Sequence, residues 1–306
     1  MSGDNPFTVL GDQPLIPELP PRPAFPQRIQ RAYELSERYP GGVELLRFYA
    51  RLAFSQQHVF DSLSISTAGG DASSSRKPKD GSFSSSLADT DGWPLLLQSV
   101  LPLFPGFARS LAGISPAAVR DRASDIAASN EVAQAHLLTR FWNGDFAQEP
   151  ANSGDSSLAD RFIALAFLQP YAEWLAQSGY SNSAAMGHAI CPICASEPIS
   201  AVLRDQDHGA RRSLVCSLCM YEWNFLRVVC PACGEDRFDL LPVFTPQETP
   251  HVRIDACETC HHYLKTVDMT KDGLAVPIVD ELAAVSLDLW ATNHGYRKLT
   301  PNLAGF

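Results

Sequence analysis

The sequence of 306 residues lacks any run of about 18 apolar residues, the length that a helix needs to cross a bilayer. Residues 1–25 are rich in proline and lack the basic segment followed by an apolar one that marks a secretory signal. A glycine-rich phosphate loop, a Gly-x-Ser-x-Gly nucleophile turn and a His-Glu-x-x-His helix are also absent. We therefore expect a cytoplasmic protein without membrane insertion, and none of the enzymes that these motifs define.

Positive charge is scarce. The formal net charge is −10 at pH 7, and acidic residues outnumber basic ones between Cys191 and Lys265. Binding to nucleic acid needs clustered lysine and arginine to neutralise the phosphates. The composition therefore predicts no nucleic-acid partner and favours a protein partner.

Cysteine is absent outside four Cys-x-x-Cys pairs. In a reducing cytoplasm such pairs indicate metal ligands or redox groups rather than structural disulfides. One pair binds a metal ion from one side and two pairs complete a tetrahedral four-sulfur site, so the sequence predicts two sites. The candidate metal ligands are Cys191, Cys194, Cys216, Cys219, Cys230, Cys233, Cys257 and Cys260.

The cysteines form two similar units. Each unit holds two pairs, separated by 21 residues in the first unit and by 23 in the second, and Arg212 and Arg253 each stand four residues before the second pair. A tandem duplication explains this likeness and predicts that the first four cysteines bind one ion and the last four another. In the alternative pairing the two inner pairs share an ion, which isolates the outer pairs. Four sulfurs suit zinc and iron alike, so the metal stays open.

Each predicted site is closed by its four thiolates. A catalytic zinc ion normally keeps one position open for water, so we interpret the ions as braces for a small module with little core of its own. His188, His261 and His262 stand next to cysteines and are interpreted as supporting or surface residues rather than ligands. Trp223 and Tyr263 follow the second pair of each unit and are interpreted as core rather than as platforms for bases.

The first half of the sequence predicts helices. Prolines favour an extended arm over residues 1–26. Apolar residues at helical spacing then predict an all-helical domain over 27–187, in which the run around Pro170 is apolar on nearly all sides and central, with a kink or an interruption at the proline. A segment rich in glycine and serine at 67–91 predicts a mobile loop.

The second half predicts strands, which makes the whole chain an α+β protein. Short β-prone runs between the cysteines predict two small β modules, rubredoxin-like or zinc-ribbon-like, at 188–227 and 228–270. A C-terminal helix and tail follow at 271–306. Asp280 and Glu281 lie in the first turn of this helix, where capping and the helix dipole explain them better than catalysis does.

A set of stretches occurs in a fixed order between about residues 190 and 300: Cys191-Pro-Ile-Cys194, Leu214-Val-Cys216-Ser-Leu-Cys219-Met-Tyr-Glu222-Trp223, Arg227-Val-Val-Cys230, Cys257-Glu-Thr-Cys260-His-His-Tyr263-Leu264-Lys265, Asp280-Glu281-Leu282-Ala283 and Leu287-Asp288-Leu289. In this order they resemble the formate dehydrogenase accessory protein family, FdhE. Ala195 departs from the glycine that often follows such a pair, as Gly234 does here, and we expect it to tune the hydrogen bonds to sulfur in the first site.

The resemblance implies a cytoplasmic, non-catalytic factor that is needed for active respiratory formate dehydrogenase. It implies that the partner is the catalytic subunit of that enzyme before export. It also implies iron in two rubredoxin-like sites, with the eight cysteines as iron ligands, and a possible homodimer linked to the metal.

Three functions follow, in order of preference. The first is a maturation factor that binds the immature catalytic subunit through a metal-stabilised module. The second is an iron-dependent redox protein that transfers electrons or senses oxygen during maturation, since iron cycles between oxidation states and zinc does not. The third and weakest is a nucleic-acid-binding zinc ribbon, which the negative charge disfavours.

Overall fold

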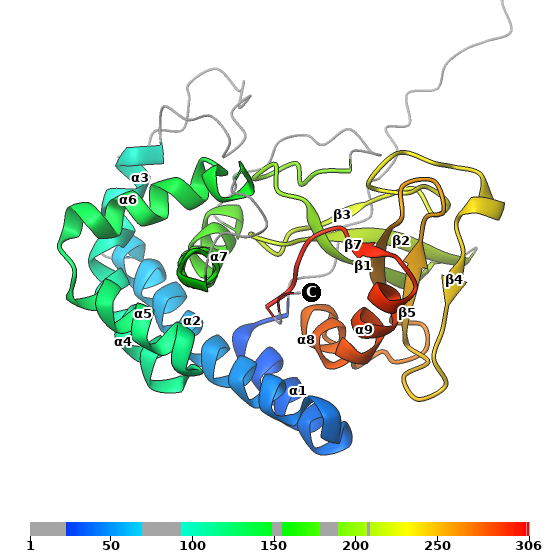
Figure 1. The fold of residues 1–306 in the computed structure, drawn as a ribbon, viewed down its shortest axis with the longest axis horizontal. Helices are drawn as coiled ribbons and strands as arrows, with labels where there is room; N and C mark the ends of the chain where they lie inside the picture. The colour runs from blue at the N-terminus through cyan, green and yellow to red at the C-terminus, as the bar shows by residue number, and fades with distance from the viewer. Residues whose placement is uncertain are drawn as a thin grey trace, which may run out of the picture.

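The computed structural model describes residues 23–68, 93–148, 155–177, 189–206, 209–303 and 305. Most of the predicted arm, and the predicted loop from residue 69 onward, lie outside these residues. Helices occupy one side of the molecule and a β-sheet the other, with two further short helices beneath the sheet (Figure 1). The predicted α+β architecture is confirmed.

The helical region packs around one central helix. The longer helices are α1 (Phe25–Arg38), α2 (Val43–Ala68), α3 (Trp93–Val100), α4 (Phe104–Ile114), α5 (Ala117–Ala128), α6 (Glu131–Trp142) and α7 (Asp155–Gln177). Helix α7 contacts α2, α4, α5 and α6, and its Ile163, Phe167 and Tyr171 are fully buried. A helix that is apolar on nearly all sides must be covered on all sides, which places α7 in the middle.

Helix α7 continues through Pro170, so of the predicted kink or interruption the interruption is wrong. Proline has no N–H group and therefore leaves the carbonyl four residues earlier, at Ala166, without its helical donor. The side chain of Gln56 on α2 fills this role, since its amide nitrogen Nε2 donates to the Ala166 carbonyl at 2.8 Å. A neighbouring helix thus supplies the missing hydrogen bond, which a sequence pattern does not show.

The strands form one mixed sheet. They are β1 (Pro198–Gln206), β2 (Gly209–Cys216), β3 (Glu222–Asn224), β4 (Val243–Phe244), β5 (Val252–Ala256), β6 (His262–Asp268) and β7 (Arg297–Lys298). Their order is β3-β2-β1-β6-β5-β4, and β7 pairs with β6. Within each cysteine unit the neighbouring strands are antiparallel.

The two cysteine units share this sheet. Strand β1 of the first unit pairs in parallel with β6 of the second, with Ala201 opposite Thr266 and Leu203 opposite Asp268. The side chains of this seam are buried on both faces, as expected of central strands. The two small β modules are therefore two halves of one continuous sheet.

The predicted C-terminal helix is present as two short helices, α8 (Pro277–Ala283) and α9 (Val285–Asn293), which break at Ala284. The buried ammonium group of Lys265 on β6 compensates for the break, because it donates to the carbonyls of Glu281 at 2.6 Å and Ala284 at 3.2 Å. These are carbonyls that a helix end leaves without a partner.

Two lysines and two carboxylates form a buried ionic cluster between β6, β7, α8 and α9. Lys265 Nζ lies 2.5 Å from Asp288 Oδ2 and 3.0 Å from Glu281 Oε1, and Lys298 pairs with the same two carboxylates. The hydroxyl of Tyr263 donates to Asp288 at 2.8 Å. Glu281 is thus a member of an ionic cluster, and the interpretation of this residue as a dipole partner was wrong.

Helix α1 binds the C-terminal helices through a second set of buried charges. Arg31 Nη2 donates to Asp280 Oδ1 and to Asp272 Oδ2, each at 2.6 Å. Asp280 also accepts the N–H of Val276 at 2.7 Å, which is the predicted capping role. Apolar residues of α1, α2 and α8 share one core around these contacts, so the first described helix packs on α8. In the described part of the chain, no helix combines the length and the apolar character that crossing a bilayer requires.

The substitution Glu281→Gln tests the ionic cluster. It leaves two buried ammonium groups with one carboxylate, and breaking a buried ion pair costs about 3–5 kcal/mol. We expect the free energy of unfolding at pH 7, measured in urea, to fall by about 3 kcal/mol. Glu37→Gln on the exposed face of α1 is the control, and an equal effect of both variants would contradict the cluster's role.

The same variant has a defined pH dependence. Burial raises the pKa of Glu281, but the charges of Lys265 and Lys298 outweigh it and lower the pKa to about 2 from its ordinary 4.5. A carboxylate with a lowered pKa stabilises the fold above its unfolded pKa and loses this effect as the pH falls towards the folded value. The stability difference between the wild type and Glu281→Gln should therefore narrow between about pH 4.5 and pH 2.

Candidate metal centres

The four Cys-x-x-Cys pairs have the same backbone turn. The residue after each pair adopts a left-handed conformation: Ala195 (φ 58°), Met220 (φ 54°), Gly234 (φ 79°) and His261 (φ 56°). In each turn the N–H of the first cysteine donates to the carbonyl five residues later, at 2.8 to 3.0 Å. The same turn at all four pairs is consistent with a duplicated unit of two pairs.

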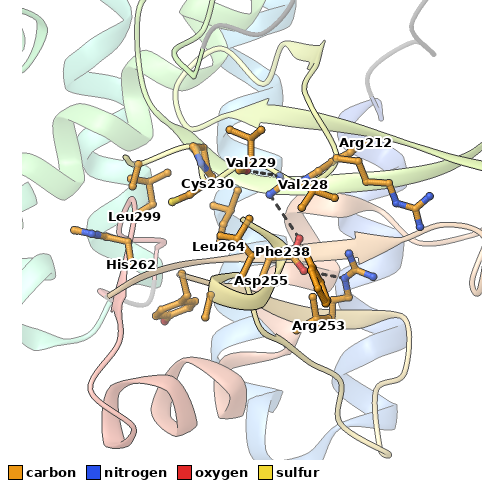
Figure 2. Close-up of a pocket in the computed structure, with 17 residues that line it drawn as sticks. Arg212, Val228, Val229, Cys230, Phe238, Arg253, Asp255, His262, Leu264 and Leu299 are labelled. Atoms are coloured by element: carbon orange, nitrogen blue, oxygen red, sulfur yellow. Dashed lines mark hydrogen bonds and ion pairs between the residues drawn. The ribbon is translucent and has the colours of Figure 1, made fainter. Parts of the chain in front are cut away.

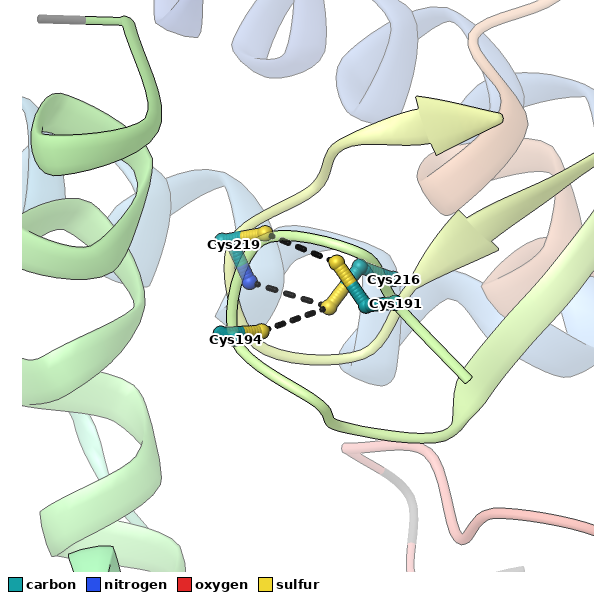
Figure 3. Close-up of side chains that lie close together, drawn as sticks. All are labelled: Cys191, Cys194, Cys216 and Cys219. Carbon is teal, nitrogen blue, oxygen red and sulfur yellow. Dashed lines mark hydrogen bonds between the residues drawn. The ribbon is translucent and has the colours of Figure 1, made fainter. Parts of the chain in front are cut away.

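Site one brings together Cys191, Cys194, Cys216 and Cys219, whose sulfur atoms lie within 4.8 Å of one another. The sulfurs of Cys191 and Cys219 are 3.5 Å apart, and those of Cys194 and Cys216 are 3.3 Å apart. Figure 3 shows the four side chains turned towards a common centre. All four are buried.

Site one lies inside the largest apolar core. This core contains the four cysteines together with Leu52 of α2, Phe104 of α4 and Phe167 of α7. The side-chain amide of Gln169 on α7 donates to the carbonyl of Ser217, between the two cysteines of the second pair, at 2.9 Å. The first unit is therefore packed and hydrogen-bonded to the helical region.

Site two brings together Cys230, Cys233, Cys257 and Cys260, also within 4.8 Å. The sulfurs of Cys230 and Cys260, and those of Cys233 and Cys257, are each 3.7 Å apart. Cys233 is exposed and Cys260 is half-buried. The second site thus lies at the surface, in contrast to the first.

The sulfur geometry fits a metal ion in both sites. The distances are far longer than the roughly 2.05 Å of a disulfide bond. A tetrahedral ion with metal–sulfur bonds of about 2.3 Å separates its sulfurs by about 3.8 Å. Site two matches this separation, and site one is slightly more compact. Each group can hold one zinc or iron ion, and both groups are the ones that the repeat predicts.

Burial at site one disfavours thiolates that have no cation beside them. Burial raises the pKa of the Cys216 thiol and the pKa of the Cys219 thiol. Buried thiolates without a positive partner are unfavourable, whereas a metal ion stabilises the deprotonated form. At site two, burial also raises the pKa of the Cys230 thiol to about 11.

The surroundings of the sulfurs differ between the sites. In site one the N–H groups of Ile193 and Leu218 point at Cys191 and Cys216 sulfurs at 3.4 and 3.3 Å. The Cys194 thiol also lies 3.4 Å from the Ser196 hydroxyl. The second unit has Glu235 at the position that corresponds to Ser196, and this carboxylate accepts the hydroxyl of Thr259 at 2.6 Å.

The described histidines and aromatic residues next to the cysteines do not join the two sulfur groups. His261 is exposed, and His262 is half-buried with its Nδ1 atom 3.1 Å from the Cys260 carbonyl; neither joins a cysteine group. His188 lies outside the described residues. Trp223 and Tyr263 are buried, so their interpretation as core is confirmed.

His251, Asp272 and Asp280 form a third cluster of groups of the kind that bind metals. His251 Nε2 lies 2.9 Å from Asp280 Oδ1, but Arg31 already donates to both aspartates. The guanidinium group of Arg31 therefore supplies the cation that pairs with both carboxylates in this cluster. No local pattern predicts this cluster, because Arg31 is 249 residues away from Asp280.

The fold and the two sulfur groups define a class: a helical domain joined to a duplicated module with closed four-cysteine sites. The family model described as "FdhE, central domain" matches residues 190–227, and the model described as "FdhE, C-terminal domain" matches residues 228–304. Residues 190–304 therefore match the models of the central and C-terminal domains of the FdhE family, and the resemblance predicted from the sequence is confirmed.

Relatives named "Protein FdhE homolog" support this assignment. One from Aquifex aeolicus is 35% identical over 147 residues, which cover 48% of this chain and 52% of the relative. The chain thus spans about half the length of that relative. One from Stutzerimonas stutzeri is 29% identical over 302 residues, covering 95% of this chain and 92% of the relative.

A solved structure shares the fold. The crystal structure of the FdhE protein from Pseudomonas aeruginosa superposes with a TM-score of 0.65 and covers 93% of this chain and 96% of that one. The two sequences are 24% identical in this comparison. The likeness extends over both the helical region and the sheet.

The equivalent variants Cys194→Ser and Cys233→Ser test the two sites. Each removes a soft ligand from one group, so we expect the bound metal, measured by elemental analysis, to fall from two ions per chain to one. Cys194→Ser should cost more stability, by several kcal/mol, because site one lies in the main core and metal binding there is folding free energy. Full metal content in either variant, or a greater loss of stability in Cys233→Ser, would contradict the assignment.

Gly234→Ala tests the left-handed turn. An added Cβ meets no atom within 4 Å, so the cost comes from φ +79° alone and should be about 1 kcal/mol of unfolding free energy. The reverse change Ala195→Gly should be neutral or stabilising, because it relieves the same strain at φ 58°. Gly273→Ala, which is also open but not left-handed, serves as the control in the urea titration. Equal stability of the Gly234 variant and this control would refute the explanation.

Proposed function

We propose that this chain is a non-catalytic accessory factor for formate dehydrogenase that binds the immature catalytic subunit in the cytoplasm. The FdhE domains at residues 190–304 support the connection to this enzyme. The negative charge of the chain supports a protein partner over a nucleic acid.

One observation supports a bracing role for the metal over a catalytic one. Each cysteine group supplies four sulfurs, and among the described residues no histidine or carboxylate joins either group. A tetrahedral ion with four thiolates has no open position for water or substrate. The helical region and the sheet pack against site one, so a metal ion there would hold these two regions together.

The metal is proposed to be iron in both sites, with zinc as the alternative. Four thiolates accept either ion, and the sequence resemblance to the FdhE family favours iron. A homodimer is compatible with this role, because a binding factor can act in either oligomeric state.

A redox role is the second candidate, and the exposure of Cys233 favours it. An electron must reach the metal from outside, and site two is the site that lies at the surface. Iron in a sulfur cage changes oxidation state whereas zinc does not. The elemental analysis of the cysteine variants therefore also decides this point, since zinc alone would exclude the redox role.

Loss of the chain from its host should abolish formate oxidation at the membrane while the catalytic subunit is still made. We expect the tagged chain, purified without oxygen, to retain that subunit in a pulldown, and Cys194→Ser to retain much less of it. Formate oxidation in washed membranes and an immunoblot of the subunit are the two measurements.

The complementing wild-type chain is the control for the deletion. Unchanged formate oxidation in the deletion strain would refute the proposed function. A pulldown without the subunit would refute direct binding.

A further inference from the structure

A cavity of about 270 Å³ lies against site two, between the two cysteine units. Its walls come from β2, the turn at 228–232, β4, β5 and β6. Figure 2 shows Arg212, Val228, Phe238 and Arg253 around it, and Cys230 of site two forms part of one wall. None of the roles assigned above uses this cavity.

The rim of the cavity is apolar and exposed. Phe238 is 80% exposed, Val243 50% and Val228 47%. These three side chains come from separate segments, yet they line one opening. An apolar rim of this kind is typical of a surface that another molecule covers.

The cavity also has an excess of positive charge. Three arginines line it, Arg212, Arg227 and Arg253, against a single carboxylate, Asp255. Asp255 accepts Arg253 Nε at 2.9 Å and lies 3.6 Å from Arg212 Nη2. The side chain of Arg227 is exposed and donates to a backbone carbonyl, that of Ala210. On a chain of net charge −10 this local excess is distinctive.

Arg212 is the most buried of the three arginines. It is 3% exposed, and its Nε–H group is buried without a hydrogen-bond partner. Its Nη1 atom donates to the carbonyls of Leu226 and Val229 at 3.2 and 2.9 Å. Burial and the neighbouring charge of Arg253 lower the pKa of Arg212, and the opposing charges of Asp255 and Cys230 do not outweigh them. A buried cation with incomplete compensation favours an added anion.

The sheet edge beside the cavity argues against recognition by strand addition. Strand β4 is the edge strand, has two residues, and stands between Pro242 and Pro246. A short edge flanked by prolines offers few free backbone groups to another strand. Side chains inserted into the cavity are therefore the mode of binding that fits.

We propose that this cavity is a docking groove for a peptide segment of a client protein that carries both acidic and apolar side chains. A carboxylate of the segment pairs with the arginines, and a neighbouring aromatic or aliphatic side chain packs between Phe238, Val228 and Val243. The inference depends on the proposed function only for the identity of the client.

A model peptide tests the groove directly. The probe is a fluorescein-labelled peptide of twelve residues that alternates leucine or phenylalanine with glutamate, titrated with the full metal-loaded chain. We expect binding that weakens about tenfold when glutamine replaces every glutamate, because charge-assisted pairs to arginine are lost. Absence of binding, or equal binding of both peptides, would overturn the proposal.

Matched variants locate the binding. Phe238→Ser and Arg253→Gln should each lower the affinity for the glutamate peptide by about tenfold, the size of effect expected for the anchors of a small interface. Val132→Ser is the control, since Val132 is 78% exposed on α6 in the helical region, and it should bind like the wild type. Equal affinities of Phe238→Ser and Val132→Ser would place the peptide elsewhere and overturn the proposal.

The same variants in the formate dehydrogenase pulldown separate the two proposals. If the wild type and Val132→Ser retain the catalytic subunit and the two groove variants lose it, the groove binds this client. If all four retain it, the groove proposal fails and the proposed function stands. If the wild type itself retains no subunit while the peptide results hold, the proposed client is wrong and the groove remains.

Discussion

Four thiolates in an apolar core are stable together only when a cation neutralises them, and site one places its sulfurs in the largest core of the described chain. The same core contains residues of α2, α4 and α7, so the helices and the first cysteine unit depend on one another. Gln169 continues this dependence by hydrogen bonding to the turn between Cys216 and Cys219. Gln169 accepts in turn from Gln56, whose amide also compensates for Pro170. A metal ion at this place therefore supports the packing of both halves.

The same constraint governs the C-terminal helices without a metal. The ammonium groups of Lys265 and Lys298 are buried, and Glu281 and Asp288 neutralise them. Removing the compensation of a buried charge is costlier than replacing the whole cluster with apolar groups, so these residues stabilise the fold as a set. The break between α8 and α9 belongs to this set, because its carbonyls are ligands of the Lys265 ammonium group.

The periodic and repeated features were predictable from the sequence, and the long-range polar contacts were not. The spacing of the cysteines predicted two groups of four, and the helical and β-prone runs predicted the two regions. The continuity of α7 depends on Gln56, which is 110 residues from Ala166, and no local pattern shows such a partner. Lys265 was visible as part of a family motif, but its role comes from helices that fold back onto β6. Polar contacts between residues that are far apart in the sequence produce no periodic pattern from which they could be predicted.

The duplication explains why two alike sites have different surroundings. Each unit kept its four cysteines and its turns, since a left-handed residue still follows every pair. The units pair along the β1–β6 seam, and the four cysteines of the first unit lie in the core that it shares with the helical region. Its sulfurs became part of a core, while those of the second stayed at the surface beside the arginine-lined cavity. Arg212 and Arg253 occupy equivalent positions in the repeat, and both guanidinium groups lie beside Asp255. Two of the three arginines that line the cavity are thus equivalent residues of the two units, brought together across one sheet.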